Sequence, residues 1–176
     1  MRKTLAAVAL ALTLAVPLQA QGLMGDMHRD LNEVQKKFID LANAIPESAY
    51  GWRPQGARSI GEVLLHVGSD NYLLPIFLGS PAPAATGVTS DFATAVAFEK
   101  RKLSKAEIVA ELNASFQHLH RTIGADDSKL AETIKLFGQD YTRQRAVILT
   151  VTHLHEHLGQ LIAYARQNNV VPPWSK

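Results

Sequence analysis

The sequence of 176 residues contains no cysteine. Disulfide bonds are therefore excluded, as are thiolate metal ligands and a cysteine nucleophile. A strong net charge is also lacking, since 18 Lys and Arg stand against 16 Asp and Glu. Without Arg2 and Lys3 near the N-terminus, the basic count falls to 16 and equals the acidic count. Such a near-neutral chain lacks the basic surface that nucleic-acid binding requires, so we expect no nucleic-acid partner.

Long apolar runs are scarce, and the longest one lies at the N-terminus. Two basic residues precede an apolar run over residues 5–16, and the small residue Ala20 follows shortly afterwards. This order predicts a secretory signal peptide over residues 1–20 that is cleaved after Ala20. The alternative is a retained anchor or an ordinary first helix. We expect a periplasmic or secreted protein with one domain over residues 21–176 and no membrane span after signal removal.

Four segments place apolar residues at alternating steps of three and four, the spacing of amphipathic helices. We expect these helices at about residues 23–45, 59–79, 104–123 and 142–168. Ser59 and Ser104 each begin a Ser-x-x-Glu capping box, which is typical of a helix N-terminus. No strand pattern and no internal repeat competes with this interpretation.

The connection over residues 80–103 is long and contains Pro81, Pro83 and Gly87 in its first half. Its second half is compatible with a short helix at about residues 92–100. A connection of this length suits a crossover better than a tight hairpin. The sequence therefore predicts an all-α four-helix bundle with one long crossover between the second and third helices.

His153 and His157 are four residues apart, so a helix places them on one face about one turn apart. Each residue turns a helix by about 100°, which puts both histidines to one side of the apolar stripe. His66 and Asp70 lie to the same side of the stripe on the second helix. Because the second and fourth helices are expected to be antiparallel neighbours, these side chains should meet at one seam. Three imidazoles with an open fourth position are typical of a reactive or substrate-binding metal site.

The same spacing leaves an alternative, in which the histidines are hydrogen-bonded between helices without a metal. His155 lies about 160° around the helix from His153 and is expected to face elsewhere. His118 and His120 are expected at the surface, and His28 is expected to be solvated or half-buried. Asp70 is a candidate fourth ligand, a partner that orients an imidazole, a general base or a solvated edge residue.

Several motifs resemble the DinB-like (DinB/YfiT) superfamily of metal-binding four-helix bundles, over essentially all of residues 21–176. They are Tyr50-Gly51-Trp52-Arg53-Pro54, the segment from Arg58 to Val67 that ends Leu65-His66-Val67, and His153-x-x-x-His157-Leu158-Gly159-Gln160-Leu161. The resemblance implies that His66, His153 and His157 are the metal ligands. Glu156 stands where relatives often have a further histidine, and Asn169 stands where many have glycine. Asparagine tolerates the same helix-cap conformation.

A three-histidine site suits a divalent ion such as zinc, nickel or iron. Hydrolysis then needs a general base. Leu154 takes the position where zinc proteases have glutamate, and Glu156 is expected to point away, which leaves Asp70 as the carboxylate on the correct flank. Trp52 is expected to be a core anchor or to line the mouth of a pocket.

Two functions remain open. The first is a metal-dependent hydrolase or transferase acting on a small molecule in the cell envelope. The alternative is a non-catalytic metal-dependent binding or structural module. Some DinB-like relatives resemble thiol-dependent S-transferases and isomerases, but an exported protein would lack the cytosolic thiol pool that this chemistry requires. A homodimer is left open.

Overall fold

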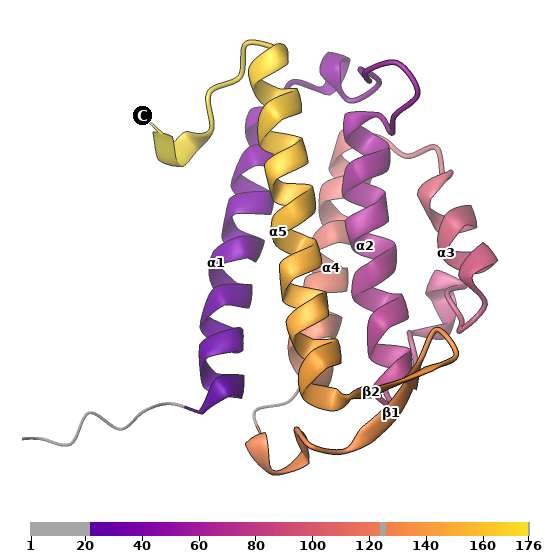
Figure 1. Cartoon of the computed structure of the whole chain (residues 1–176). Coiled ribbons are helices and arrows are strands. Elements are labelled where there is room, and N and C mark those ends of the chain that lie inside the picture. Colours follow the sequence, from indigo (N-terminus) through magenta and orange to yellow (C-terminus); the bar gives the residue numbers. More distant parts are fainter. Residues whose placement is uncertain (1–21, 124–125, 176) are drawn as a thin grey trace, which may run out of the picture.

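The computed structural model describes residues 22–123 and 126–175. The expected signal peptide therefore lies outside the described residues. The described part contains five α-helices and one β-hairpin (Figure 1): α1 (Leu23–Ala44), α2 (Ile60–Phe77), α3 (Phe92–Glu99), α4 (Lys105–Ile123), β1 (Thr133–Leu136), β2 (Gln139–Thr142) and α5 (Arg143–Gln167). Short 3₁₀ turns occur at Glu47–Ala49, Ala84–Thr86, Asp127–Lys129 and Pro173–Ser175. None of the helices within these two ranges is long and apolar enough to cross a bilayer.

Four long helices, α1, α2, α4 and α5, form the bundle. In Figure 1, α1 and α5 run in one direction and α2 and α4 run in the other. Contacts at the helix ends agree with this arrangement, since Lys105 Nζ donates to the carbonyl of Ile45 at 2.7 Å and Arg143 Nη1 donates to that of Leu78 at 3.2 Å. Because α2 and α4 are parallel neighbours, the chain must return along the bundle between them. The predicted four-helix bundle with one long crossover is confirmed.

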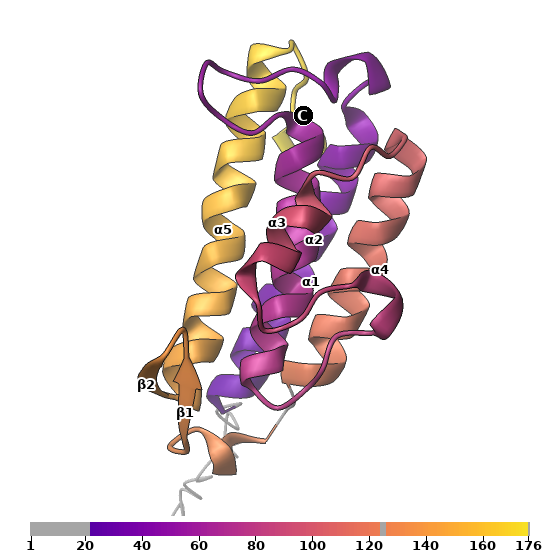
Figure 2. The same cartoon turned by 90° about the vertical axis from the view of Figure 1, so that its right-hand side faces the viewer.

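The crossover contains α3, which packs along the outer side of α2 (Figure 2). Helix α2 is consequently covered by α3, α4 and α5, and most of its residues are buried, including His66 and Asp70. Polar groups in such a position are costly unless they are paired, because burial removes their water. The fold therefore places the candidate site residues where each polar atom needs a partner.

Both predicted capping boxes are present. The backbone N–H of Glu62 donates to Ser59 Oγ at 3.2 Å, and the N–H of Ser59 donates to Glu62 Oε2 at 2.8 Å. Ser104 and Glu107 exchange the same two hydrogen bonds, at 3.3 Å and 2.7 Å. These contacts satisfy N–H groups that have no partner within the helix, and they define where α2 and α4 begin.

The expectation that no strand occurs is wrong. Strands β1 and β2 pair antiparallel, with Leu136 opposite Gln139, so that Phe137 and Gly138 form a two-residue turn. Each strand has four residues, and the one fully buried side chain is Leu136, which is 1% exposed. Four residues with one core contact give too short an alternation to stand out from a loop. Gly138 was the available signal, because a two-residue hairpin turn favours glycine there.

His118 and His120 are not at the surface, which corrects a second expectation. His118 is 6% exposed, and its ring lies 5.4 Å from that of Tyr72 on α2. His120 is partly buried and is hydrogen-bonded to Gln35 on α1 at 2.8 Å. His28 is half-buried, as expected, and stacks on His120 at 6.0 Å. Helix α4 has neighbours on both sides, α2 and α1, so residues beside its apolar stripe are also covered.

Candidate metal centre

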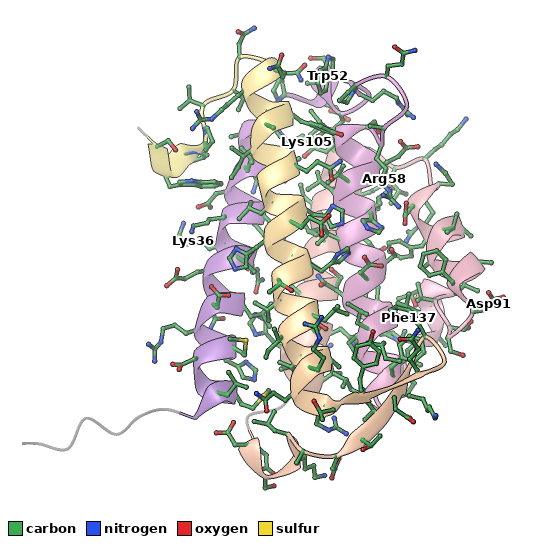
Figure 3. All side chains as sticks on the ribbon, viewed as in Figure 1. Lys36, Trp52, Arg58, Asp91, Lys105 and Phe137 are labelled. Atoms are coloured by element: carbon green, nitrogen blue, oxygen red, sulfur yellow. The ribbon has the colours of Figure 1, made fainter. Side chains whose placement is uncertain are left out.

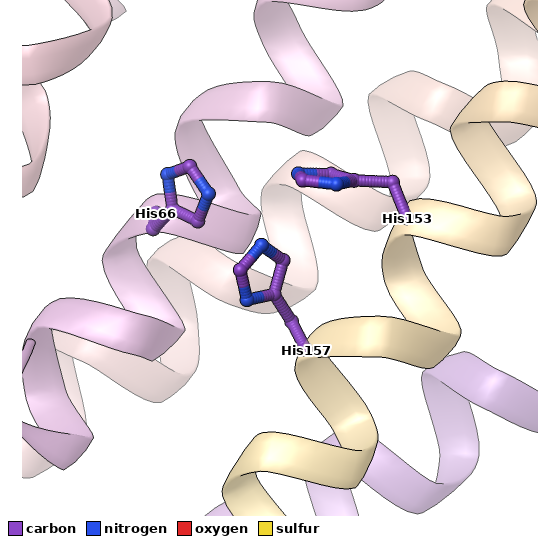
Figure 4. A group of neighbouring side chains, drawn as sticks. All are labelled: His66, His153 and His157. Carbon is purple, nitrogen blue, oxygen red and sulfur yellow. The ribbon is translucent and has the colours of Figure 1, made fainter.

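His66 on α2 and His153 and His157 on α5 meet at one seam of the bundle (Figure 4). The ring centroids of His66 and His153 lie 4.5 Å and 4.4 Å from that of His157, and 5.6 Å from each other. One nitrogen from each ring lies within 4.8 Å of the other two. Among the residues that the structure describes, no other group of three or more His, Asp and Glu side chains is arranged in this way. The seam predicted from helix geometry is therefore present.

Two of the imidazoles are held by their Nδ1 atoms. His66 Nδ1 lies 2.6 Å from Glu99 Oε1, and His157 Nδ1 lies 2.9 Å from Gln160 Oε1. An acceptor at Nδ1 favours the tautomer that carries its proton there, which leaves the Nε2 lone pair free. This pairing of a ligand histidine with an outer oxygen is typical of metal sites.

His157 Nε2 is buried and has no hydrogen-bond partner. An unpaired buried polar atom costs on the order of 1–3 kcal/mol, so such atoms are rare and usually have a reason. Burial also lowers the pKa of His157, which favours the neutral imidazole that metals bind. A divalent cation would satisfy this atom together with the nitrogens of His66 and His153. The residues present thus fit a metal ion.

Glu99 also belongs to the site, and it was not among the residues predicted from the sequence. It lies at the last residue of α3, and Arg58 Nε donates to its Oε2 at 2.8 Å. Burial raises the pKa of the Glu99 carboxyl. Hydrogen bonds from His66 and Arg58, together with the charges of both, lower this pKa by more, so it lies below its usual value. Glu99 therefore stays ionised and orients His66. The packing of a crossover helix against α2 cannot be read from periodicity, although a glutamate after the apolar run Phe92–Phe98 was a signal.

Asp70 lies one turn after His66, and its carboxylate faces two of the imidazoles. Asp70 Oδ2 is 2.8 Å from His153 Nε2 and 3.2 Å from His66 Nε2. The hydrogen bond that His153 donates to Asp70 raises the pKa of His153, and burial of the ring opposes this effect. Asp70 therefore lies on the flank that the sequence predicted. The structure leaves three roles for it, as a further ligand, a partner that orients an imidazole, or a group that accepts a proton.

The other candidate residues take different positions. His155 faces away from the seam, as expected, and its Nε2 lies 2.9 Å from Asp30 on α1. Glu156 was expected to point away from the site and does so only in part. Its side chain is largely exposed, but Oε2 lies 3.7 Å from His153 Nδ1.

Trp52 lies at the end of the bundle where α5 finishes (Figure 3) and packs edge-on against Tyr164, with ring centroids 5.3 Å apart. The Tyr164 hydroxyl accepts a hydrogen bond from Gln160 Nε2 at 2.8 Å, and Gln160 in turn holds His157. Trp52 is packed against the hydrophobic core and does not line the cavity beside the histidines. The core-anchor interpretation is the one that the structure supports.

A cavity of about 330 Å³ opens beside the histidines. Its volume lies at the lower end of the range for small-molecule sites. Polar side chains gather at one end of it, and apolar side chains form most of the remaining wall. The polar residues are His66, Asp70, Thr152, His153 and Glu156, and the apolar residues are Leu73, Leu74, Phe92, Phe137 and Leu149.

The family model of the DinB superfamily, DinB_2, matches residues 30–161, and the chain belongs to this superfamily. The fold is shared with a DinB-like protein from Bacillus cereus ATCC 10987, at 12% identity and a TM-score of 0.70 over 85% of this chain and 95% of that one. It is also shared with YfiT from Bacillus subtilis, at 15% identity and a TM-score of 0.66 over 84% of this chain and 88% of that one. YfiT is described as a probable metal-dependent hydrolase with an unusual four-helix bundle topology.

An uncharacterised protein from Escherichia coli UTI89 is similar at 18% identity and a TM-score of 0.61, over 84% of this chain and 95% of that one. Identities this low show a common fold and nothing finer. No curated protein matches the chain.

Proposed function

We propose that His66, His153 and His157 bind one divalent cation, either zinc, nickel or iron, and that the protein is a metal-dependent hydrolase or transferase acting on a small molecule. The observation that carries this proposal is the unpaired, buried Nε2 of His157, which lies among three converging imidazoles. YfiT, which shares the fold, is described as a probable metal-dependent hydrolase, and this description agrees with the proposal.

A bound divalent cation would act as a Lewis acid toward a carbonyl or phosphoryl oxygen of the substrate. The chain itself supplies the remaining parts of the site. Glu99 and Gln160 hold two of the imidazoles in fixed orientations. Asp70 is buried beside the histidines and can accept a proton there. The cavity walls would bind the rest of the substrate and exclude water from it.

The alternative is a site that binds a metal without turnover. A purely structural metal site is closed by four protein ligands. Here His66 and His153 line a cavity, and the Asp70 carboxylate lies within hydrogen-bonding distance of both. The cavity favours a site that receives a ligand, provided that Asp70 does not itself complete the coordination.

The test combines metal analysis of the purified protein with a screen of ester, amide and phosphodiester substrates. We expect about one divalent ion per chain and hydrolysis that a chelator abolishes. Asp70→Asn should lower turnover by a factor of about 10²–10⁴ if Asp70 transfers the proton. Wild-type protein that binds no metal would overturn the proposal, and one that binds metal but hydrolyses none of these classes would support the non-catalytic alternative.

We also propose that the protein is exported. This proposal rests on the basic start, the apolar run and the small residue Ala20 in the sequence.

A further inference from the structure

The cavity beside the histidines is divided by polarity along its length. On α2, Leu73 and Leu74 follow Asp70 by about one turn, and on α5, Leu149 precedes His153 by one turn. Because α2 and α5 are antiparallel, both sets of apolar residues lie on the same side of the histidines, toward the hairpin (Figure 1). At about 1.5 Å of rise per residue, this apolar section extends about 6–12 Å from the histidines.

Two exposed aromatic side chains line the cavity as well. Phe92, the first residue of α3, is 55% exposed, and Phe137, in the hairpin turn, is 54% exposed. Figure 2 shows the hairpin and α3 on either side of the same face of the bundle, and Figure 3 labels Phe137 on that face. These two half-exposed rings offer apolar surface to a ligand in the cavity.

Phe137 is held in a conformation that phenylalanine rarely adopts. Its φ is +51°, and φ of the following Gly138 is +78°. Both central residues of the two-residue turn are therefore left-handed, which is a turn that normally contains Asn-Gly. A bulky side chain pays roughly 1–2 kcal/mol for this conformation. The hairpin thus retains an aromatic ring at a position where its own stability would favour asparagine, and strain of this kind is frequent at ligand sites.

The charges at the polar end restrict what a ligand presents there. Asp70 and Glu156 both line that end, and Glu99 lies directly behind His66. Because Arg58 offsets the charge of Glu99, two carboxylates remain, and their charge balances that of a divalent cation held by the histidines. A neutral carbonyl oxygen can approach this cation without adding further charge.

We infer that the ligand is a neutral acyl compound, an ester or amide whose carbonyl lies at the histidines and whose aliphatic chain extends toward Phe92 and Phe137. The inference rests on the proposed metal site and specifies the substrate class of that site. Phe92 and Phe137 are specificity-determining residues that enclose the end of the chain, and Leu73, Leu74 and Leu149 form the wall between them and the histidines.

The test measures binding of acetohydroxamate, hexanohydroxamate and octanohydroxamate to the zinc-loaded full-length protein by calorimetry. A hydroxamate chelates a metal ion through its carbonyl and N–O oxygens and normally loses its hydroxyl proton on binding. The three compounds share this head group and differ only in chain length, so comparing them isolates the contribution of the aliphatic chain. Each buried methylene should tighten binding about fourfold. Octanohydroxamate should therefore bind on the order of a hundredfold more tightly than acetohydroxamate, even if only about half of its added methylenes are buried.

Phe137→Asn and Phe92→Ala should each reduce the octanohydroxamate affinity roughly tenfold while zinc content and acetohydroxamate affinity stay close to wild type. Asparagine suits the left-handed turn, so Phe137→Asn removes the ring and its contact with Phe77 while keeping a residue that the turn favours. Trp174→Ala is the control, because Trp174 is another exposed aromatic residue and does not line the cavity.

The outcomes separate the two proposals. Equal affinities for the three hydroxamates, with zinc bound, would overturn the acyl inference and leave the metal site intact. An unchanged chain-length preference in both phenylalanine variants would overturn the role of these two residues. Protein that binds neither zinc nor acetohydroxamate would overturn the metal site and the acyl inference together.

Discussion

His157 is the residue whose contacts are hardest to explain without a metal ion. Its Nδ1 is paired with Gln160, and its Nε2 is buried and unpaired. His153 Nε2 is hydrogen-bonded to Asp70 Oδ2 at 2.8 Å, and His66 Nε2 lies 3.2 Å from the same oxygen, so both atoms have a polar neighbour without a metal. Among the three rings, the unpaired nitrogen of His157 is therefore the strongest indication of a metal ion, although each ring would supply one ligand.

Replacing His66, His153 or His157 by alanine should abolish or strongly weaken binding of one divalent ion, because each variant loses one of three ligands. His155→Ala is the matched control, since His155 lies on the same helix, faces α1 and should leave the metal content unchanged. Asp70→Asn should retain the metal if Asp70 is not a ligand. Metal content per chain decides each case. Loss of metal in His155→Ala with retention in His153→Ala would contradict this assignment.

Phe137 allows a separate prediction about stability. Phe137→Asn relieves the left-handed strain, whereas Phe137→Ala removes the ring and keeps the strain. Both variants lose the contact with the Phe77 ring, whose centroid is 5.2 Å away. The asparagine variant should therefore be about 1 kcal/mol more stable than the alanine variant. Urea denaturation measures the difference, and an alanine variant that is equally stable would show that the turn is not strained.

At the residue scale, the sequence predicted contacts that depend on one helix and one neighbour. The angular positions of His66, His153 and Asp70 follow from helix geometry, and the structure places them at the predicted seam. Glu99 could not be found in this way, because its contact depends on how a crossover segment folds back over α2. His118 was misplaced for a related reason, since its burial depends on a second neighbour of α4.

At the scale of elements, α3 has a function that its length does not suggest. This eight-residue helix carries Phe92 at one end and Glu99 at the other, so it contributes both to the cavity wall and to the support of His66. Arg58, which precedes α2, fixes Glu99 from the opposite side. The crossover is therefore part of the site and not only a connection.

Glu99→Gln should weaken metal binding by about 10–100-fold, because an amide orients His66 less strongly than a carboxylate does. The side chain keeps its size, so the fold should be retained. Glu33→Gln on the exposed face of α1 makes the same change of charge far from the histidines and should leave metal affinity unchanged. Zinc titration against a competing chelator measures both variants. Equal affinities in Glu99→Gln and wild type would show that Glu99 does not support the site.

The capping box of α2 predicts a dependence of stability on pH. The hydrogen bond from the Ser59 N–H is the main reason that the pKa of Glu62 is lowered, and Lys100 and Arg53 act in the same direction against burial. Because the folded pKa lies below the unfolded value, the stabilisation is present at neutral pH and is lost as pH falls through the folded pKa. Glu62→Gln should cost roughly 0.5–1 kcal/mol at neutral pH and less in acid. Urea denaturation of wild type and Glu62→Gln at neutral and at acidic pH checks this. A difference in unfolding free energy that is the same at both would contradict the prediction.

The helices themselves were predictable to within one or two residues at each end, because capping boxes and apolar spacing mark their limits. The short helix α3 was also expected within the crossover. The hairpin was not predicted, because four-residue strands depend on tertiary contacts. Here these are mainly the contacts of Leu136 with the core. Phenylalanine before Gly138 weakened the turn signal of that glycine, since asparagine is the usual residue at the first position of such a turn.

At the scale of the whole molecule, the arrangement of the four long helices explains why the site is where it is. Two neighbouring parallel helices, α2 and α4, require a long crossover, and this crossover leaves α2 free to meet α5 in the antiparallel sense. The length of residues 80–103 predicted this arrangement. Proteins at 12–18% identity share this fold.

Residues 1–20 lie outside the described residues, and their sequence predicts how the chain is processed. Their order of basic, apolar and small residues predicts cleavage after Ala20. Cleavage would remove Arg2 and Lys3 and leave 16 basic and 16 acidic residues, so the exported protein would be close to neutral. Expression in a bacterial host, followed by fractionation and intact-mass analysis, should find a periplasmic or secreted chain that begins at Gln21. A soluble cytosolic product that still carries residues 1–20 would contradict export and would reopen thiol-dependent chemistry for the histidine site.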